Sequence, residues 1–179
     1  MGKNVLILST SLRKGSNSEA LAEEFEKGAK EAGHNAEIVY LHDKTIKFCT
    51  GCLVCQETKR CVIRDDADAI VQKMLTAEVV VFATPIYFYE MSGQMKTLLD
   101  RSNPLFPSDY AFRDIYLLAA AADEEESAMD GAVKGLTGWI DCFDKTTLKA
   151  VVRGTGVTDA GDIQGNSALR KAYELGKAL

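Results

Sequence analysis

Five apolar runs recur along the chain and are separated by segments with a helical pattern. The runs cover residues 5–8, 36–41, 78–84, 115–122 and 147–152. Adjacent apolar residues without polar alternation are typical of parallel strands that are covered on both faces. In the segment after the first run, Leu21, Phe25 and Ala29 share one helical stripe. The pattern predicts an α/β fold, a doubly wound, five-stranded parallel sheet with helices on both faces.

The helices have recognisable boundaries. Ser16 and Glu19 have the spacing of a capping box, and Gly33 ends the helix that follows. Further helices are expected at residues 67–75, 94–101 and 166–179, and around residues 136–143, where Cys142 is predicted to lie in the core. A chain of 179 residues is long enough for one well-buried α/β domain and short for two. We therefore expect a single domain over residues 1–179.

A polar loop follows the first apolar run. Residues 9–18 read STSLRKGSNS and gather hydroxyls, an amide and two cations around Gly15. The free N–H groups and the dipole of the next helix favour an anion there, and Arg13 adds a charge-assisted bond. The loop matches neither a Walker sequence nor G-x-G-x-x-G, which favours a monophosphate over a pyrophosphate. The residues expected to bind it are Ser9, Ser11, Arg13, Ser16, Asn17 and Ser18. The alternative is a surface turn whose serines only cap the helix.

An aromatic loop follows the third apolar run. In an open parallel sheet, ligands bind beyond the carboxyl ends of the strands, so this loop should lie beside the polar loop. Its aromatic side chains suit a flat heterocycle. The residues expected to border that ring are Pro85, Ile86, Tyr87, Phe88 and Tyr89. The small residues 120–122, at the end of the fourth run, would let the ring approach.

Four cysteines lie close together in the segment FCTGCLVCQETKRC. Cys49, Cys52, Cys55 and Cys61 have the spacing C-x2-C-x2-C-x5-C, close to a ferredoxin run that holds a [4Fe–4S] cluster. Three interpretations remain open: a [4Fe–4S] cluster, a metal-free loop, and a zinc site. Spacing identifies possible ligands but does not show that the four thiols converge.

Two strings resemble one known family. The polar loop resembles the phosphate loop of the flavodoxin-like, NADPH-dependent FMN reductases, which runs roughly S-x-R-x-x-S-N-[ST]. The strings T-P-I-Y and S-G-Q-M-K-T-L-L-D-R, from residue 84 to residue 101, resemble the second signature of that family. The cysteine run is similar to that of the iron–sulfur flavoproteins, a branch of the same superfamily. The resemblance implies non-covalently bound FMN, NAD(P)H as co-substrate, and a homodimer or homotetramer.

The expected activity is therefore that of an NAD(P)H-dependent FMN oxidoreductase with a quinone, flavin or similar acceptor. An iron–sulfur electron carrier acting on protein partners is the first alternative, and a thiol redox sensor is the second. No residue stands out as catalytic, because the flavin itself supplies the chemistry. A net charge of -5 argues against a nucleic-acid partner. No apolar run approaches the length of about 18 residues that a membrane span needs, so we expect a cytoplasmic protein without a membrane partner.

Overall fold

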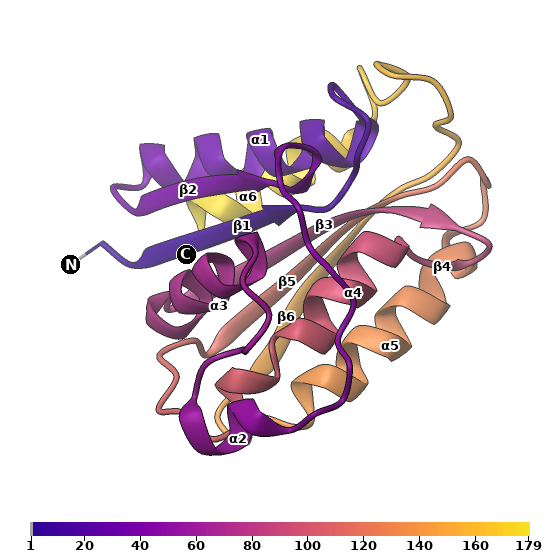
Figure 1. Ribbon diagram of the computed structural model, residues 1–179. Coiled ribbons are helices and arrows are strands. Elements are labelled where there is room, and N and C mark those ends of the chain that lie inside the picture. The colour runs from indigo at the N-terminus through magenta and orange to yellow at the C-terminus, as the bar shows by residue number, and fades with distance from the viewer. Residues whose placement is uncertain (1) are drawn as a thin grey trace.

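The computed structural model describes residues 2–179, which form a parallel sheet between two layers of helices (Figure 1). Its strands are β1 (Asn4–Ser9), β2 (Asn35–Tyr40), β3 (Val79–Tyr87), β5 (Asp114–Ala120) and β6 (Thr147–Gly154). They are ordered β2-β1-β3-β5-β6, and all neighbours in this order are parallel. This confirms the predicted five-stranded sheet. The short strand β4 (Glu90–Met91), which the sequence did not predict, folds back antiparallel on the end of β3.

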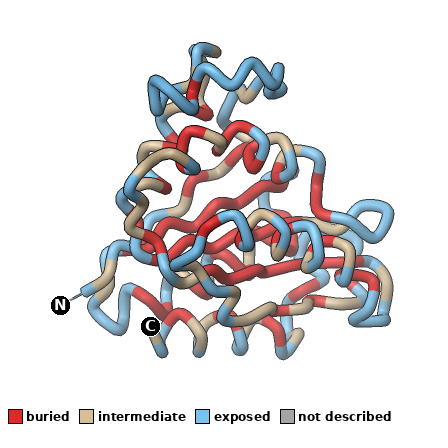
Figure 2. The backbone as a smooth tube through the Cα atoms, turned by 90° about the horizontal axis from the view of Figure 1, so that it is seen from below, coloured by how far each residue is buried: buried red, intermediate tan, exposed pale blue. Residues whose placement is uncertain are grey.

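The helices cover both faces of the sheet, as predicted. One face carries α1 (Asn17–Glu31) and α6 (Ser167–Lys177), and the other carries α3 (Asp66–Thr76), α4 (Gly93–Arg101) and α5 (Asp130–Ile140). Each face has its own apolar core, because alternate residues of the central strands point to opposite sides. Figure 2 shows the buried residues concentrated in the strands and on the inner faces of the helices.

Most predicted boundaries lie within two residues of the observed ones. The third strand differs, because β3 continues through Pro85 to Tyr87 while it pairs with β5 and β4. The core position predicted for Cys142 is wrong: the residue follows the end of α5 and is exposed, whereas Phe143 turns inward. Among the described residues, no helix is both long enough and apolar enough to cross a membrane.

Candidate functional site

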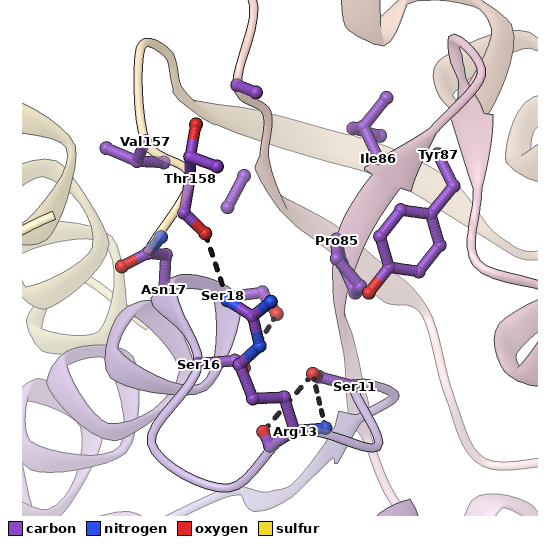
Figure 3. Close-up of a pocket in the computed structure, with 12 residues that line it drawn as sticks. Ser11, Arg13, Ser16, Asn17, Ser18, Pro85, Ile86, Tyr87, Val157 and Thr158 are labelled. Atoms are coloured by element: carbon purple, nitrogen blue, oxygen red, sulfur yellow. Dashed lines mark hydrogen bonds between the residues drawn. The ribbon is translucent and has the colours of Figure 1, made fainter. Parts of the chain in front are cut away.

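A cleft of about 190 Å³ lies at the carboxyl ends of β1, β3 and β5. At this point the chain order of the strands reverses, with β2 on one side of β1 and β3 on the other, which is where open α/β sheets bind ligands. The residues that line the cleft come from four chain segments (Figure 3): Ser11, Arg13, Ser16, Asn17, Ser18, Pro85, Ile86, Tyr87, Ala120, Ala122, Val157 and Thr158. The structure thus brings the polar loop and the aromatic loop together, as expected.

Three of the residues predicted to bind a cofactor do not line the cleft. Ser9 is the last residue of β1 and is fully buried, and its hydroxyl has no hydrogen-bond partner in the described part of the chain. Phe88 and Tyr89 lie at the tip of the β3–β4 hairpin, and their side chains are largely exposed. The sequence places these residues near the site but does not fix the direction of their side chains.

The start of α1 forms the floor of the cleft. Ser16 is the N-cap, and its Oγ accepts a hydrogen bond of 3.2 Å from the backbone N–H of Glu19. Because that oxygen acts as acceptor, its own hydrogen is free to donate, and Ser18 Oγ lies 3.3 Å away. The second half of the predicted capping box differs: the Glu19 carboxylate accepts from the N–H of Gly15 at 3.1 Å. Two hydroxyl donors thus lie at the positive end of a 15-residue helix.

Arg13 reaches across the cleft. Its backbone is fixed by Ser11, whose Oγ accepts from the N–H of Arg13 at 3.1 Å. Its guanidinium Nη1 donates to the carbonyl oxygen of Thr158 at 2.9 Å, which joins the two walls (Figure 3). A neutral carbonyl is a weaker partner for a guanidinium than an anionic oxygen is. This side chain therefore narrows the cleft and is well placed to turn towards a phosphate.

Asn17 lines the cleft and also makes two hydrogen bonds that hold the cleft together. Its Nδ2 donates to the carbonyl oxygen of Asp159 at 2.9 Å, and its Oδ1 accepts from the N–H of Ile163 at 3.2 Å. The amide group therefore ties the start of α1 to the loop between β6 and α6. Asn17 thus positions that loop as well as lining the cleft, and its role in binding a cofactor stays a prediction.

The loop after β6 is a third wall that sequence reasoning missed. Thr158 and its neighbour Val157 line the cleft, although they lie about 140 residues from the polar loop in sequence. Asp162 Oδ2 accepts from the backbone N–H groups of Asp159 at 2.7 Å and Thr158 at 3.0 Å. These two bonds lower the pKa of the Asp162 carboxyl. The string T-D-A-G-D could have indicated this ordered loop, because aspartate side chains often accept hydrogen bonds from backbone N–H groups nearby in the same turn.

A chain of buried hydroxyls connects the polar loop to the hairpin. Thr10 Oγ1 donates to the carbonyl of Ala83 at 2.9 Å and lies 3.1 Å from Ser92 Oγ, while the N–H of Ser92 donates to Thr84 Oγ1 at 3.0 Å. The three hydroxyl-bearing residues are fully buried. Ser92 also caps α4 by accepting from the N–H of Met95. This network fixes the spacing between the two loops that line the cleft.

The four clustered cysteines do not converge. Cys49 and Cys52 are exposed, and Cys49 Sγ accepts only a local bond, 3.4 Å from the N–H of Gly51. Cys55 is buried, and its Sγ accepts from Asn103 Nδ2 at 3.3 Å. Burial raises the pKa of the Cys55 thiol, against a lowering contribution from this bond. Within residues 2–179, no group of three or more His, Cys, Asp or Glu side chains is placed to hold a metal ion. This arrangement does not fit a [4Fe–4S] cluster or a zinc site.

A buried ion pair holds the base of the cysteine segment. Arg101 is fully buried and binds both oxygens of Asp65, at 2.7 and 2.8 Å. It also donates to the carbonyls of Lys47 and Ile63, the residues that flank the cysteine segment. Burial alone would raise the pKa of the Asp65 carboxyl, but hydrogen bonds from Arg101, Lys47 and Ala67 outweigh it and lower the pKa. Arg101 therefore fixes the backbone on both sides of the cysteine segment.

The cleft fits the phosphate end of a flavin mononucleotide. Hydroxyl donors, a guanidinium and a helix start are the groups that hold a phosphate dianion in proteins. Ala120 and Ala122 also line the cleft, at the end of the strand that neighbours β3, and their small side chains leave room for a flat ring. The sheet order and the position of the cleft define a flavodoxin-like protein with a site at its switch point.

The comparison with known families agrees with this geometry. The family model for NADPH-dependent FMN reductases matches residues 3–157, and the chain belongs to this family. YwqN of Bacillus subtilis, named as an NAD(P)H-dependent FMN-containing oxidoreductase, is 28% identical over 184 residues, which cover 96% of this chain and 95% of that protein. This likeness runs along almost the whole chain.

Other relatives are similar over a shorter stretch. The iron–sulfur flavoprotein MJ1083 of Methanocaldococcus jannaschii is 39% identical over 101 residues, or 56% of this chain. The chain spans about half the length of this relative, with 52% covered. The solved NAD(P)H:quinone oxidoreductase of Methanothermobacter marburgensis superposes with a TM-score of 0.73 at 17% identity, covering 99% of this chain and 98% of that one. At this identity the likeness shows the fold.

Proposed function

We propose that this protein is an FMN-dependent NAD(P)H oxidoreductase that passes electrons to a small-molecule acceptor. The observation that carries the proposal is the cleft itself, which joins a phosphate-type loop at the start of α1 to the aromatic end of β3. Bound FMN would supply the redox chemistry, since it accepts a hydride from a nicotinamide and releases electrons to an acceptor. The names of YwqN and of the quinone oxidoreductase are consistent with this activity.

The chain's own residues bind and orient the cofactor. Ser11, Ser16, Ser18 and Arg13 would hold the phosphate. Pro85, Ile86 and Tyr87 would border the flavin ring, next to the small residues Ala120 and Ala122. In this scheme the residues position the cofactor and exclude water from it, and none takes part in a covalent step. We further infer that residues 1–179 act as one FMN-binding domain and that the active form is a homodimer or homotetramer in the cytoplasm.

A titration tests the phosphate loop directly. The FMN-free protein is titrated with FMN and with riboflavin, which lacks the phosphate, and flavin fluorescence reports binding. Several charge-assisted contacts should make riboflavin weaker by about 100-fold or more. Equal affinities would place the phosphate outside the cleft. Adding NADPH to the FMN-loaded protein without oxygen should then bleach the visible flavin bands.

A second candidate function is electron transfer through a [4Fe–4S] cluster. The cysteine spacing and the name of MJ1083 favour it, whereas the positions of the four thiols oppose it. The visible spectrum of protein purified without oxygen separates the two functions. Two flavin bands alone, with no bound iron, support the reductase. A broad brown absorbance that is lost in air would show a cluster and a different arrangement of the cysteine segment.

A further inference from the structure

A buried acidic side chain lies behind the polar loop. Glu19, in the first turn of α1, is 8% exposed, and its Oε1 accepts from the backbone N–H of Gly15 at 3.1 Å. Its other oxygen, Oε2, has no hydrogen-bond partner in the described part of the chain. A buried carboxylate is costly unless a cation compensates its charge. The same charge, at the helix start that forms the floor of the cleft, also repels a phosphate dianion.

His42 lies on the far side of this carboxylate. It belongs to the short 3-10 helix η1 (Leu41–Asp43), directly after β2, and its Nε2 lies 3.7 Å from Glu19 Oε2. The two side chains are 10% and 11% exposed. The imidazole also stacks on the Tyr40 ring, with 5.4 Å between the ring centroids. Within residues 2–179, His42 is the only side chain that forms an ion-pair contact with Glu19.

A second carboxylate holds the imidazole from the other side. His42 Nδ1 lies 2.9 Å from Asp43 Oδ1, and this contact is the main cause that lowers the pKa of the Asp43 carboxyl. Lys14 Nζ lies 3.6 Å from the same oxygen. The contacts therefore lead from Gly15 through Glu19, His42 and Asp43 back to Lys14, in the same loop. Two neighbouring carboxylates favour the charged imidazole, while burial opposes it.

The other titratable groups on this side of α1 add negative charge. Burial raises the pKa of the Glu23 carboxyl, and the charges of Glu19, Glu26 and Glu24 add to this effect. Burial likewise raises the pKa of the Tyr40 hydroxyl, with contributions from Glu23, Glu19 and Glu26. These neighbours cannot neutralise Glu19. The compensation of its charge thus falls to His42.

We propose that His42 is a positioning residue of the phosphate site, which in its imidazolium form neutralises Glu19 and keeps the start of α1 favourable to a phosphate dianion. This inference rests on the proposed function, in which the phosphate of FMN binds at that loop. His42 does not line the cleft and acts through Glu19. Because binding and protonation are linked reciprocally, FMN binding takes up protons at the imidazole. Histidine ordinarily changes its charge between about pH 5 and 8, so the coupling belongs to that range.

The first test measures FMN affinity by fluorescence titration of the FMN-free protein. At about pH 6, His42→Gln should bind FMN about three- to tenfold more weakly than the wild type, and at about pH 8.5 the difference should vanish. Riboflavin, which lacks the phosphate, should bind both proteins equally. The phosphate's own second ionisation, near pH 6, cancels in this ratio because both proteins meet the same ligand. The matched control is His34→Gln at the opposite end of β2, where His34 Nδ1 accepts from the N–H of Lys3 at 3.0 Å.

A second variant separates the charge of Glu19 from its hydrogen bond. Glu19→Gln keeps an oxygen that can accept from Gly15 and removes the charge. Adding His42→Gln to it should therefore cost no further FMN affinity at either pH. A weakening of FMN and riboflavin by the same factor in His42→Gln would overturn the proposal by making the residue merely structural. A loss in the double variant as large as in His42→Gln alone would do so too.

A third measurement needs no variant. The chain has two histidines, so nitrogen-15 NMR of the wild type can follow each imidazole through a pH titration. FMN should move the titration midpoint of His42 to higher pH, whereas riboflavin should not, and His34 should stay unchanged with either ligand. An unmoved His42 midpoint alongside tighter binding of FMN than of riboflavin would overturn this inference alone. Equal binding of the two flavins would overturn it together with the proposed phosphate site. A failure of NADPH to bleach bound FMN would refute only the oxidoreductase activity.

Discussion

The polar loop and the cysteine segment are both rich in reactive side chains, yet only the first builds a site among the described residues. In the polar loop, Ser16 caps a helix, Ser11 holds the backbone of Arg13, and Asn17 reaches the loop after β6. In the cysteine segment, α2 (Val54–Thr58) is one short turn of helix between two residues of positive φ. A group of polar residues forms a binding site when hydrogen bonds to the backbone fix the directions of its side chains. The start of a helix provides such hydrogen bonds, whereas the spacing of cysteines along the chain does not.

The two regions also differ in how they are attached to the sheet. The polar loop continues directly from β1 into α1, so the sheet and the helix fix both of its ends. The cysteine segment instead depends on Arg101 and Asp65, a buried pair contributed by α4 and by the N-cap of α3. Arg60 of the segment also binds Asp68 of α3, and Cys55 accepts from Asn103. The most deeply buried of these tertiary contacts is the pair of Arg101 and Asp65.

Breaking that contact should have the largest effect. Asp65→Ala leaves the buried guanidinium of Arg101 without its carboxylate, which should lower the free energy of unfolding by about 3–5 kcal/mol. Urea unfolding followed by circular dichroism measures the change. The control is Asp100→Ala, which breaks the exposed pair with Lys96 and should cost less than about 1 kcal/mol. Similar losses in the two variants would show that the buried pair does not hold the segment.

A change in the polar loop should act on binding more than on stability. Arg13→Ala removes a charge-assisted contact to the phosphate, so FMN should bind about 10- to 150-fold more weakly, or about 1.5–3 kcal/mol. Fluorescence titration of the FMN-free variant measures this loss. Lys14→Ala is the matched control, because Lys14 lies in the same loop, outside the cleft lining, with its ammonium 3.6 Å from Asp43. An unchanged affinity in Arg13→Ala would place the phosphate elsewhere.

The smallest expected effect is a pH-dependent loss of stability in the loop after β6, which forms the third wall of the cleft. The folded chain lowers the pKa of Asp162, so its bonds to Asp159 and Thr158 stabilise the protein above the unfolded pKa of about 3.9 and are lost as the pH falls through the folded value. The melting temperature of the wild type should therefore fall more steeply than that of Asp162→Asn between pH 5 and pH 3. Parallel curves would mean that this carboxylate does not support the loop.

The periodicity of the chain predicted most of the fold because each central strand is an uninterrupted apolar run. Such a run is stable only when helices cover both of its faces. The same reasoning placed Pro85, Ile86 and Tyr87 beside the polar loop. Phe88 and Tyr89 lie outside the cleft lining, on a turn that packs against Gly131, and their role towards a cofactor stays a prediction. The core position of Cys142 was wrong, because the residue lies just beyond the last turn of its helix. Those positions depend on neighbours that are distant in sequence.

The sequence by itself determined the family and the sheet. It also named eleven residues expected to bind the cofactor, and eight of these line the cleft. The family follows from the resemblance of two motifs. The sheet and the loop residues follow from strand and helix periods, from the capping of a helix start, and from the rule that ligands bind at the carboxyl ends of parallel strands. The tertiary structure alone decided that Arg13 bonds to Thr158 across the cleft and that Asn17 braces the loop after β6. It also decided that, among the described residues, the clustered cysteines are not arranged to hold a metal ion. The physical reason is that hydrogen bonds between distant segments direct these side chains, and short-range patterns in a sequence do not encode such contacts.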